Sequence, residues 1–141
     1  MSDFNECLKR RGLVRFSSAP DVVERELAAA AADLADAGTM LENGQWKWLT
    51  ITGYYAMFHA ARALVMREGY AEKSHYCLAV AFREIFGTTE EGRDLAAGLE
   101  RARVLRENAD YLSDYDETGA RAALTVARRF VAFAEKHSQD G

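Results

Sequence analysis

Several features that mark other classes of protein are scarce in this 141-residue chain. Its two cysteines, Cys7 and Cys77, lie far apart and belong to no CxxC pair, so we expect reduced thiols that pack as small apolar groups. The longest stretch free of Lys, Arg, Asp and Glu runs from Trp48 to Ala61, and it is shorter than the ~18–20 residues of a membrane span. The polar segment through Arg11 does not resemble a signal peptide. We therefore expect a cytoplasmic protein with no membrane partner.

The motifs of several kinds of catalytic site are also absent from the sequence. It has no HExxH, no paired cysteines, no glycine-rich phosphate loop and no Ser/His/Asp order, so we expect no metal and no cofactor. A surplus of positive charge is missing too, because the formal net charge is −4. Proteins that bind nucleic acid through phosphate contacts are usually basic over the binding face. Any role with RNA would therefore need a local cluster of positive charge.

The chain is instead rich in helix-forming residues, with one proline and with glycines placed singly where helices end. Six helices are predicted, at about 3–11, 20–43, 46–68, 74–86, 89–112 and 117–137. The segment 12–19 is predicted to be a loop. The third helix is apolar on nearly every side and should be the central, most buried element. These elements predict a single all-α domain over residues 1–141, in which helix 3–11 precedes an antiparallel up-and-down bundle of five to six helices.

One segment of the third helix resembles the signature helix of the HEPN family. It reads GYYAMFHAARAL over residues 53–64, and an alanine-rich helix that ends at a glycine turn precedes it. A helix start follows at Lys73-Ser74-His75, and the segment RENADY follows at 106–111. The similarity in order and spacing extends over about residues 22–133, which is most of the chain.

This resemblance implies a fold and a set of partners. HEPN proteins are helical bundles that usually pair as homodimers, and many are encoded beside a small nucleotidyltransferase. The HEPN member then acts as a toxin or as the substrate of modification. Several members are metal-independent ribonucleases with an Arg-x4–6-His motif. In these enzymes the resemblance implies that the arginine stabilises the phosphorane charge and the histidine takes a proton from the 2′-hydroxyl.

The chain departs from this motif at one position. Arg106 stands where the motif arginine would, but the residue five positions later is Tyr111. A tyrosine with a pKa near ~10 is a poor base at neutral pH, whereas histidine near ~6.5 is suited to that role. Loss of general-base catalysis costs ~10²–10⁴-fold in rate. Arg106 and Tyr111 are therefore the candidate catalytic residues of a weak or degenerate site.

The helical positions of these residues leave two interpretations open. Arg106 and Tyr111 lie roughly 140° apart around a straight helix, so they should converge only if the helix breaks or if each chain of a dimer supplies one of them. Alternatively, Arg106 forms an ordinary ion pair with Asp110, four residues later on the same face.

A cleft at a dimer seam would be locally basic despite the acidic total. Four residues are candidates for binding an RNA or nucleotide phosphate there: His59, Arg62, Arg103 and Arg106. The alternative for His59 is a hydrogen-bonded histidine of the core. We interpret His75 as a residue of a helix cap, and Tyr54 as a core residue whose hydroxyl reaches a polar partner.

Two classes of function follow. The favoured one is a homodimeric HEPN-like interaction module, the partner of a nucleotidyltransferase in a toxin–antitoxin pair, with degenerate or weak RNA-directed activity. The alternative is a metal-independent endoribonuclease toxin with a variant Arg-x4-Tyr site.

Overall fold

The computed structural model describes residues 2–139, which form six α-helices and two short strands. In chain order the elements are α1 (Asp3–Lys9), β1 (Leu13–Arg15), α2 (Pro20–Glu42), α3 (Trp46–Arg67), β2 (Tyr70–Glu72), α4 (His75–Phe86), α5 (Glu90–Tyr111) and α6 (Glu117–Gln139).

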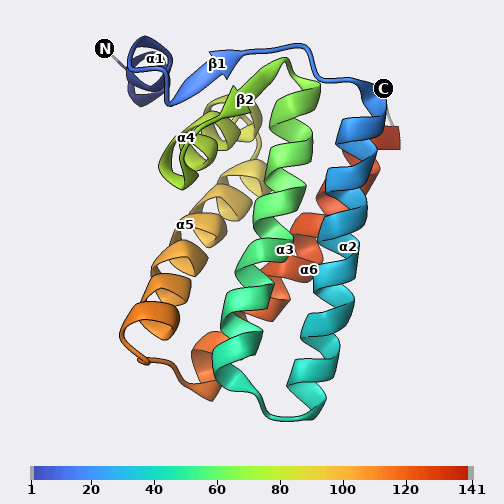
Figure 1. Cartoon of the computed structure of the whole chain (residues 1–141), viewed down its shortest axis with the longest axis vertical. Helices are drawn as coiled ribbons and strands as arrows, with labels where there is room; N and C mark the ends of the chain where they lie inside the picture. The colour runs from blue at the N-terminus through green and yellow to red at the C-terminus, as the bar shows by residue number, and fades with distance from the viewer. Residues whose placement is uncertain (1, 140–141) are drawn as a thin grey trace.

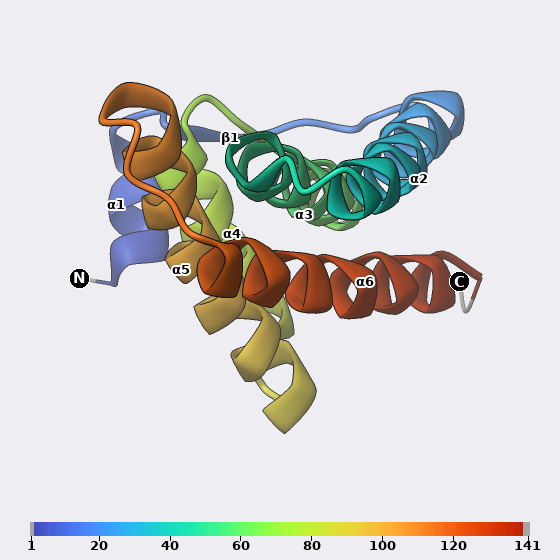
Figure 2. The ribbon, with the colours of Figure 1, turned by 90° about the horizontal axis from the view of Figure 1, so that it is seen from below.

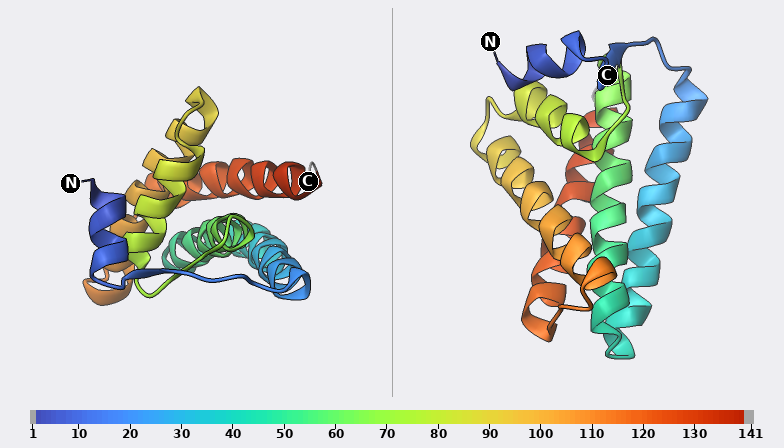
Figure 3. Two further views of the ribbon diagram at one scale, coloured as in Figure 1. Left: turned by 90° about the horizontal axis from the view of Figure 1, so that it is seen from above. Right: turned by 60° about the vertical axis from the view of Figure 1, so that its left-hand side comes forward.

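The four long helices alternate in direction, as short connections between amphipathic helices require (Figure 1). Helices α2 and α3 lie side by side in one layer and α6 lies in a second, while α5 crosses them obliquely (Figure 2). The short helices α1 and α4 lie together at one end of the bundle (Figure 3). The prediction of an all-α, up-and-down bundle is confirmed.

Helix α3 is the central element, as its apolar character predicts. It packs against α2, α4, α5 and α6, and it buries residues on several sides. Its fully buried side chains include Leu49, Tyr54, Met57 and Leu64. Even so, no helix in the described part of the chain combines the length and apolar character that crossing a bilayer requires.

The segment predicted as a loop contains a strand. Strand β1 pairs antiparallel with β2, so that Leu13 lies opposite Glu72 and Arg15 opposite Tyr70. The helix before it is also shorter than expected, because it ends at Lys9 and Arg11 takes a positive φ of 61°. Strands of three residues carry too little pattern to be recognised in a sequence and are stabilised here by long-range pairing.

The expectation of two separate, reduced thiols is wrong. Cys7 of α1 and Cys77 of α4 form a disulfide, with their Cα atoms 5.8 Å apart. Gly12 passes so close that a Cβ atom there would lie 2.6 Å from the Cys77 sulfur. In the chain-entropy model, closing a loop across 70 positions stabilises the fold by about 4 kcal/mol. The bond fixes α1 to the first turn of α4.

Candidate functional site

Arg106 of α5 is buried, at 6% exposure. The Glu72 side chain is also only 6% exposed, but it is paired closely with Arg62, whereas Arg106 has no such close partner among the described residues. The buried stripe of α5 contains Leu95, Leu99, Ala102 and Ala109. Arg106 is four residues after Ala102 and three before Ala109, so the helix turns it to the same side. The helical period therefore places a guanidinium where an apolar side chain is expected.

Three tyrosine rings surround the Arg106 guanidinium. The distance from its Cζ atom to the ring centroid is 5.3 Å for Tyr54 and 5.9 Å for both Tyr55 and Tyr111. These separations are within the range of cation–π attraction. Two of the rings come from α3 and one from the last turn of α5, so the seam between these helices forms the site.

Arg106 has little direct counter-charge. The carboxylate nearest to it is that of Glu107, 3.8 Å from Nη2, and this side chain is 41% exposed. The buried Nε atom of Arg106 has no hydrogen-bond partner among the described residues. Buried donors are almost always paired, and charged donors bind anions most strongly. The guanidinium thus has unused capacity to bind an anion.

Two expectations about Arg106 are corrected. It does not pair with Asp110, because its side chain lies on the Glu107 side and over the tyrosine rings. It does converge with Tyr111, although α5 remains helical through that residue and no partner chain is involved. The angle between the Cα positions was a poor guide because both side chains are long enough to reach back across the helix surface.

Arg103 lies one turn before Arg106 but is neutralised by neighbouring carboxylates. It forms ion pairs with Glu100 and, at 3.0 Å, with Glu107. Its hydrogen bonds to Glu100 raise the pKa of the Arg103 guanidinium above its ordinary value. Glu107 therefore holds Arg103 in place and is shared only weakly with Arg106.

His59 and Arg62 take part in a different network. His59 Nδ1 lies 2.7 Å from Glu26 of α2, and Arg62 binds Glu72 of β2 at 2.6 Å. Asp33 lies 3.8 Å from the other nitrogen of His59. The interpretation of His59 as a hydrogen-bonded histidine matches this geometry, although the residue lies at a polar seam. Carboxylates, rather than Arg106, are the partners of both residues in the described structure.

The site contains a histidine that the sequence analysis interpreted as a helix-cap residue. His75, the first residue of α4, lies 2.6 Å from the Tyr54 hydroxyl through Nδ1, and its ring stacks on Phe58 at 4.5 Å. Burial, aided by the charge of Arg106, lowers the pKa of His75. Burial also raises the pKa of the Tyr54 hydroxyl, against the opposing effect of Arg106. Both groups are therefore neutral near pH 7.

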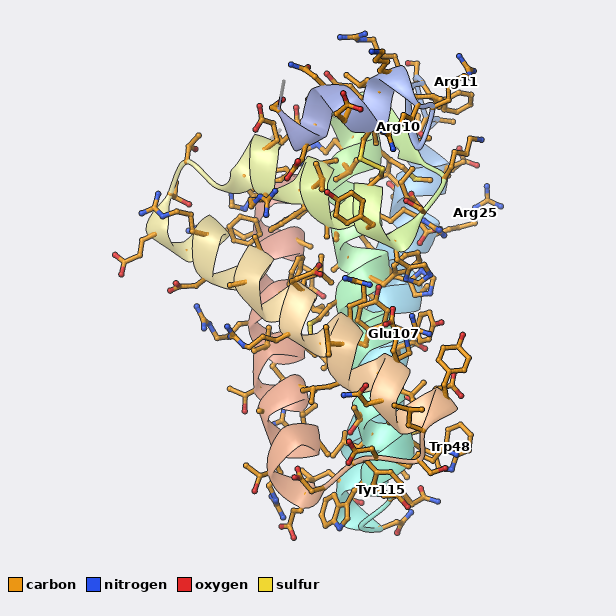
Figure 4. All side chains as sticks on the ribbon, turned by 90° about the vertical axis from the view of Figure 1, so that its left-hand side faces the viewer. Arg10, Arg11, Arg25, Trp48, Glu107 and Tyr115 are labelled. Carbon is orange, nitrogen blue, oxygen red and sulfur yellow. A yellow bond between two sulfur atoms is a disulfide. The ribbon has the colours of Figure 1, made fainter. Side chains whose placement is uncertain are left out.

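Four large exposed apolar side chains lie at the end of the bundle where α3 begins and α5 ends (Figure 1). They belong to Trp48, Tyr111, Leu112 and Tyr115, which are 47–73% exposed. Trp48 and Tyr115 appear on the same face as Glu107 in Figure 4. Leu112 follows the last helical residue of α5 and is 71% exposed. We refer to these four residues as the aromatic patch.

Comparisons with known proteins agree with this architecture. The HEPN domain model matches residues 23–137. A UPF0332 protein of Archaeoglobus fulgidus is 32% identical over 119 residues, which are 82% of this chain and 92% of that protein. A UPF0332 protein of Pyrococcus horikoshii is 36% identical over 56 residues, which are 40% of this chain and 39% of that protein.

Proposed function

Since the chain belongs to the HEPN family, we propose that it is a homodimeric HEPN module that binds RNA phosphate at Arg106. In this proposal it is the partner of a nucleotidyltransferase in a toxin–antitoxin pair, and its RNA-directed activity is weak. The nucleotidyltransferase and the toxin role come from the family resemblance. A cytoplasmic location goes with the proposal, because RNA and nucleotides are found there, although the Cys7–Cys77 disulfide is a kind of bond that is rare in that compartment.

The observation that carries the RNA part is the incomplete neutralisation of Arg106. Its Nε atom has no hydrogen-bond partner in the described structure, and its nearest carboxylate is 3.8 Å away. A phosphate that reaches the exposed 8% of this side chain would supply the missing charge, whereas the Nε atom itself is covered. Tyr111, which contacts the same guanidinium and is 73% exposed, offers a face on which an unpaired base can stack.

The aromatic patch supports the homodimer. Exposed apolar groups clustered on one face are typical of protein interfaces, where tyrosine and tryptophan are enriched. Twofold pairing of this face buries the patch and places two Arg106 sites along one seam, which raises the local positive charge.

The mass in solution tests the homodimer. We expect light scattering at micromolar concentration to give about twice the 15.7 kDa chain mass. Leu112→Asp should shift the protein toward the monomer, because it puts a charge into the patch. Phe16→Asp is the matched control, since Phe16 is 58% exposed but follows β1, far along the chain from the patch. A wild-type monomer at this concentration contradicts the homodimer.

The second candidate function is a metal-independent endoribonuclease with a variant Arg-x4-Tyr site. The contact between Arg106 and Tyr111 favours it, because the two motif positions meet within one chain. Cleavage would attach the ribose 2′-oxygen to phosphorus and release the 5′-oxygen of the next nucleotide. The 2′-oxygen would lose one proton, and the released 5′-oxygen would gain one. A group near Tyr111 would need to accept the first proton.

Restoring an imidazole at position 111 tests this candidate. Tyr111→His is expected to raise RNA cleavage above the wild-type level at about pH 6.5–7.5 without added metal, because imidazole has a pKa in that range. The gain should disappear when Arg106→Ala is added, since nothing then balances the developing phosphate charge. Robust wild-type cleavage that Arg106→Ala leaves unchanged would place the activity elsewhere in the protein.

A further inference from the structure

The hydrogen bond between Tyr54 and His75 determines which imidazole nitrogen carries the proton. Tyr54 is 1% exposed, and His75 Nδ1 is the one hydrogen-bond partner of its hydroxyl in the described structure. A buried hydroxyl needs an acceptor for its proton, and the nearby guanidinium of Arg106 can only donate. The Tyr54 hydroxyl therefore donates to Nδ1, and the neutral imidazole carries its own proton on Nε2.

The surroundings of His75 keep this ring neutral and fixed. Arg106 and Arg103 of α5 and Arg62 of α3 oppose a positive charge on the ring, and Glu72 of β2 is the one neighbouring group that favours it. The ring stacks on Phe58 at 4.5 Å, so its plane is held. The result is an oriented N–H donor that is partly exposed to solvent.

Arg106 and His75 contact the same pair of tyrosines. The Arg106 Cζ atom lies 5.3 and 5.9 Å from the Tyr54 and Tyr55 rings, and the His75 ring lies 5.7 and 6.3 Å from them. His75 also begins α4, a 12-residue helix with no acidic residue in its first turn. The positive end of that helix therefore adds to the charge of Arg106.

We propose that His75 is a second phosphate ligand of the Arg106 site, and that it acts as a neutral donor through the Nε2–H that Tyr54 fixes. The ligand is a phosphate group, either of a mononucleotide or of an RNA strand. Position 111 lacks the motif histidine, and His75 of α4 supplies an imidazole to the site instead. In this proposal that imidazole binds phosphate and does not remove a proton. This proposal rests on the proposed function, because it takes Arg106 to be the primary phosphate ligand.

Two substitutions at position 75 separate the possible roles of the imidazole. In His75→Gln the side-chain amide reaches the place of Nε2 and keeps a donor there. In His75→Asn the shorter amide reaches the place of Nδ1, so it keeps the acceptor for Tyr54 but loses the outer donor. If His75 acts as a neutral donor, His75→Gln should keep the affinity within about threefold of the wild type. His75→Asn should lower the affinity roughly tenfold or more. His137→Gln, on α6, is the control.

The affinity is measured by fluorescence anisotropy with a ~10-nucleotide single-stranded RNA, and by NMR titration with uridine 3′-monophosphate and with inorganic phosphate. Tight binding of the RNA alone identifies a strand as the ligand, and similar binding of the nucleotide identifies its terminal phosphate. Thermal melts establish that each variant is folded. Equal losses in both position-75 variants, or no loss in either, overturn the proposal.

The tautomer is measured separately, without any ligand, from long-range ¹H–¹⁵N correlations of the His75 ring. We expect the Nε2–H form in the wild type and a mixture of tautomers in Tyr54→Phe. An Nδ1–H wild type overturns the proposal whatever the affinities are. If Arg106→Gln leaves phosphate binding unchanged, the proposed function itself fails. If Arg106→Gln abolishes binding while His75→Asn does not weaken it, only the role of His75 is wrong.

Discussion

Replacing Phe58 by alanine is expected to lower the free energy of unfolding by about 3–5 kcal/mol. Phe58 lies in the middle of α3 and is 5% exposed. The His75 ring stacks on it at 4.5 Å, and the guanidinium of Arg62 lies 4.5 Å from its centroid. The substitution removes these contacts and leaves a cavity that the surrounding helices fill only in part. This loss is a large share of the ~5–15 kcal/mol that stabilises a typical domain.

Urea unfolding measures this effect, with Phe16→Ala as the matched control. Phe16 has the same side chain but is 58% exposed, so its loss should change the stability by about 0.5 kcal/mol or less. The two variants share their chemistry and differ only in burial. If Phe58→Ala costs no more than Phe16→Ala, then Phe58 does not contribute to the core as described here.

The sequence predicted the helices well because their apolar residues recur at the helical period. The end of α3 at Arg67, shortly before Gly69, follows from such local signals. So does the cap of α5 at Thr89, whose side chain accepts a hydrogen bond from the amide of Gly92. Local propensity and packing agree in these segments, so one sequence suffices to place them.

The missed features depend on contacts between distant residues. Cys7 and Cys77 are 70 positions apart, and Tyr54 and His75 are 21 apart. Each pair meets because of the way α4 packs at the end of the bundle, and no periodicity in the sequence encodes that placement. Local patterns in the sequence therefore do not show whether His75 caps a helix or belongs to the site.

The site itself was predicted in part. Arg106 was selected from the family resemblance, and its register within the buried stripe of α5 supplies an independent physical reason. Arg103 and Arg62 were grouped with it because of their charge alone. Their carboxylate partners, Glu100 and Glu72, neutralise them locally, and such pairing between side chains becomes visible only in three dimensions.

Removing the charge of Arg106 is expected to weaken RNA binding strongly. Truncating one partner of a buried, hydrogen-bonded charge pair costs about 2–5 kcal/mol, which is roughly thirtyfold or more in Kd. Each phosphate contact also contributes about one unit to the salt dependence of binding, so that slope should fall by about one for each site.

The central claim is tested most directly by comparing Arg106→Gln with Arg101→Gln in an anisotropy titration against single-stranded RNA at several salt concentrations. Both residues lie on α5, and each substitution lowers the net charge of −4 by one unit, but Arg101 is exposed whereas Arg106 is buried. The account predicts that Arg106→Gln loses most of the affinity and part of the salt dependence, while Arg101→Gln stays near the wild type. Equal, small losses in the two folded variants would contradict it.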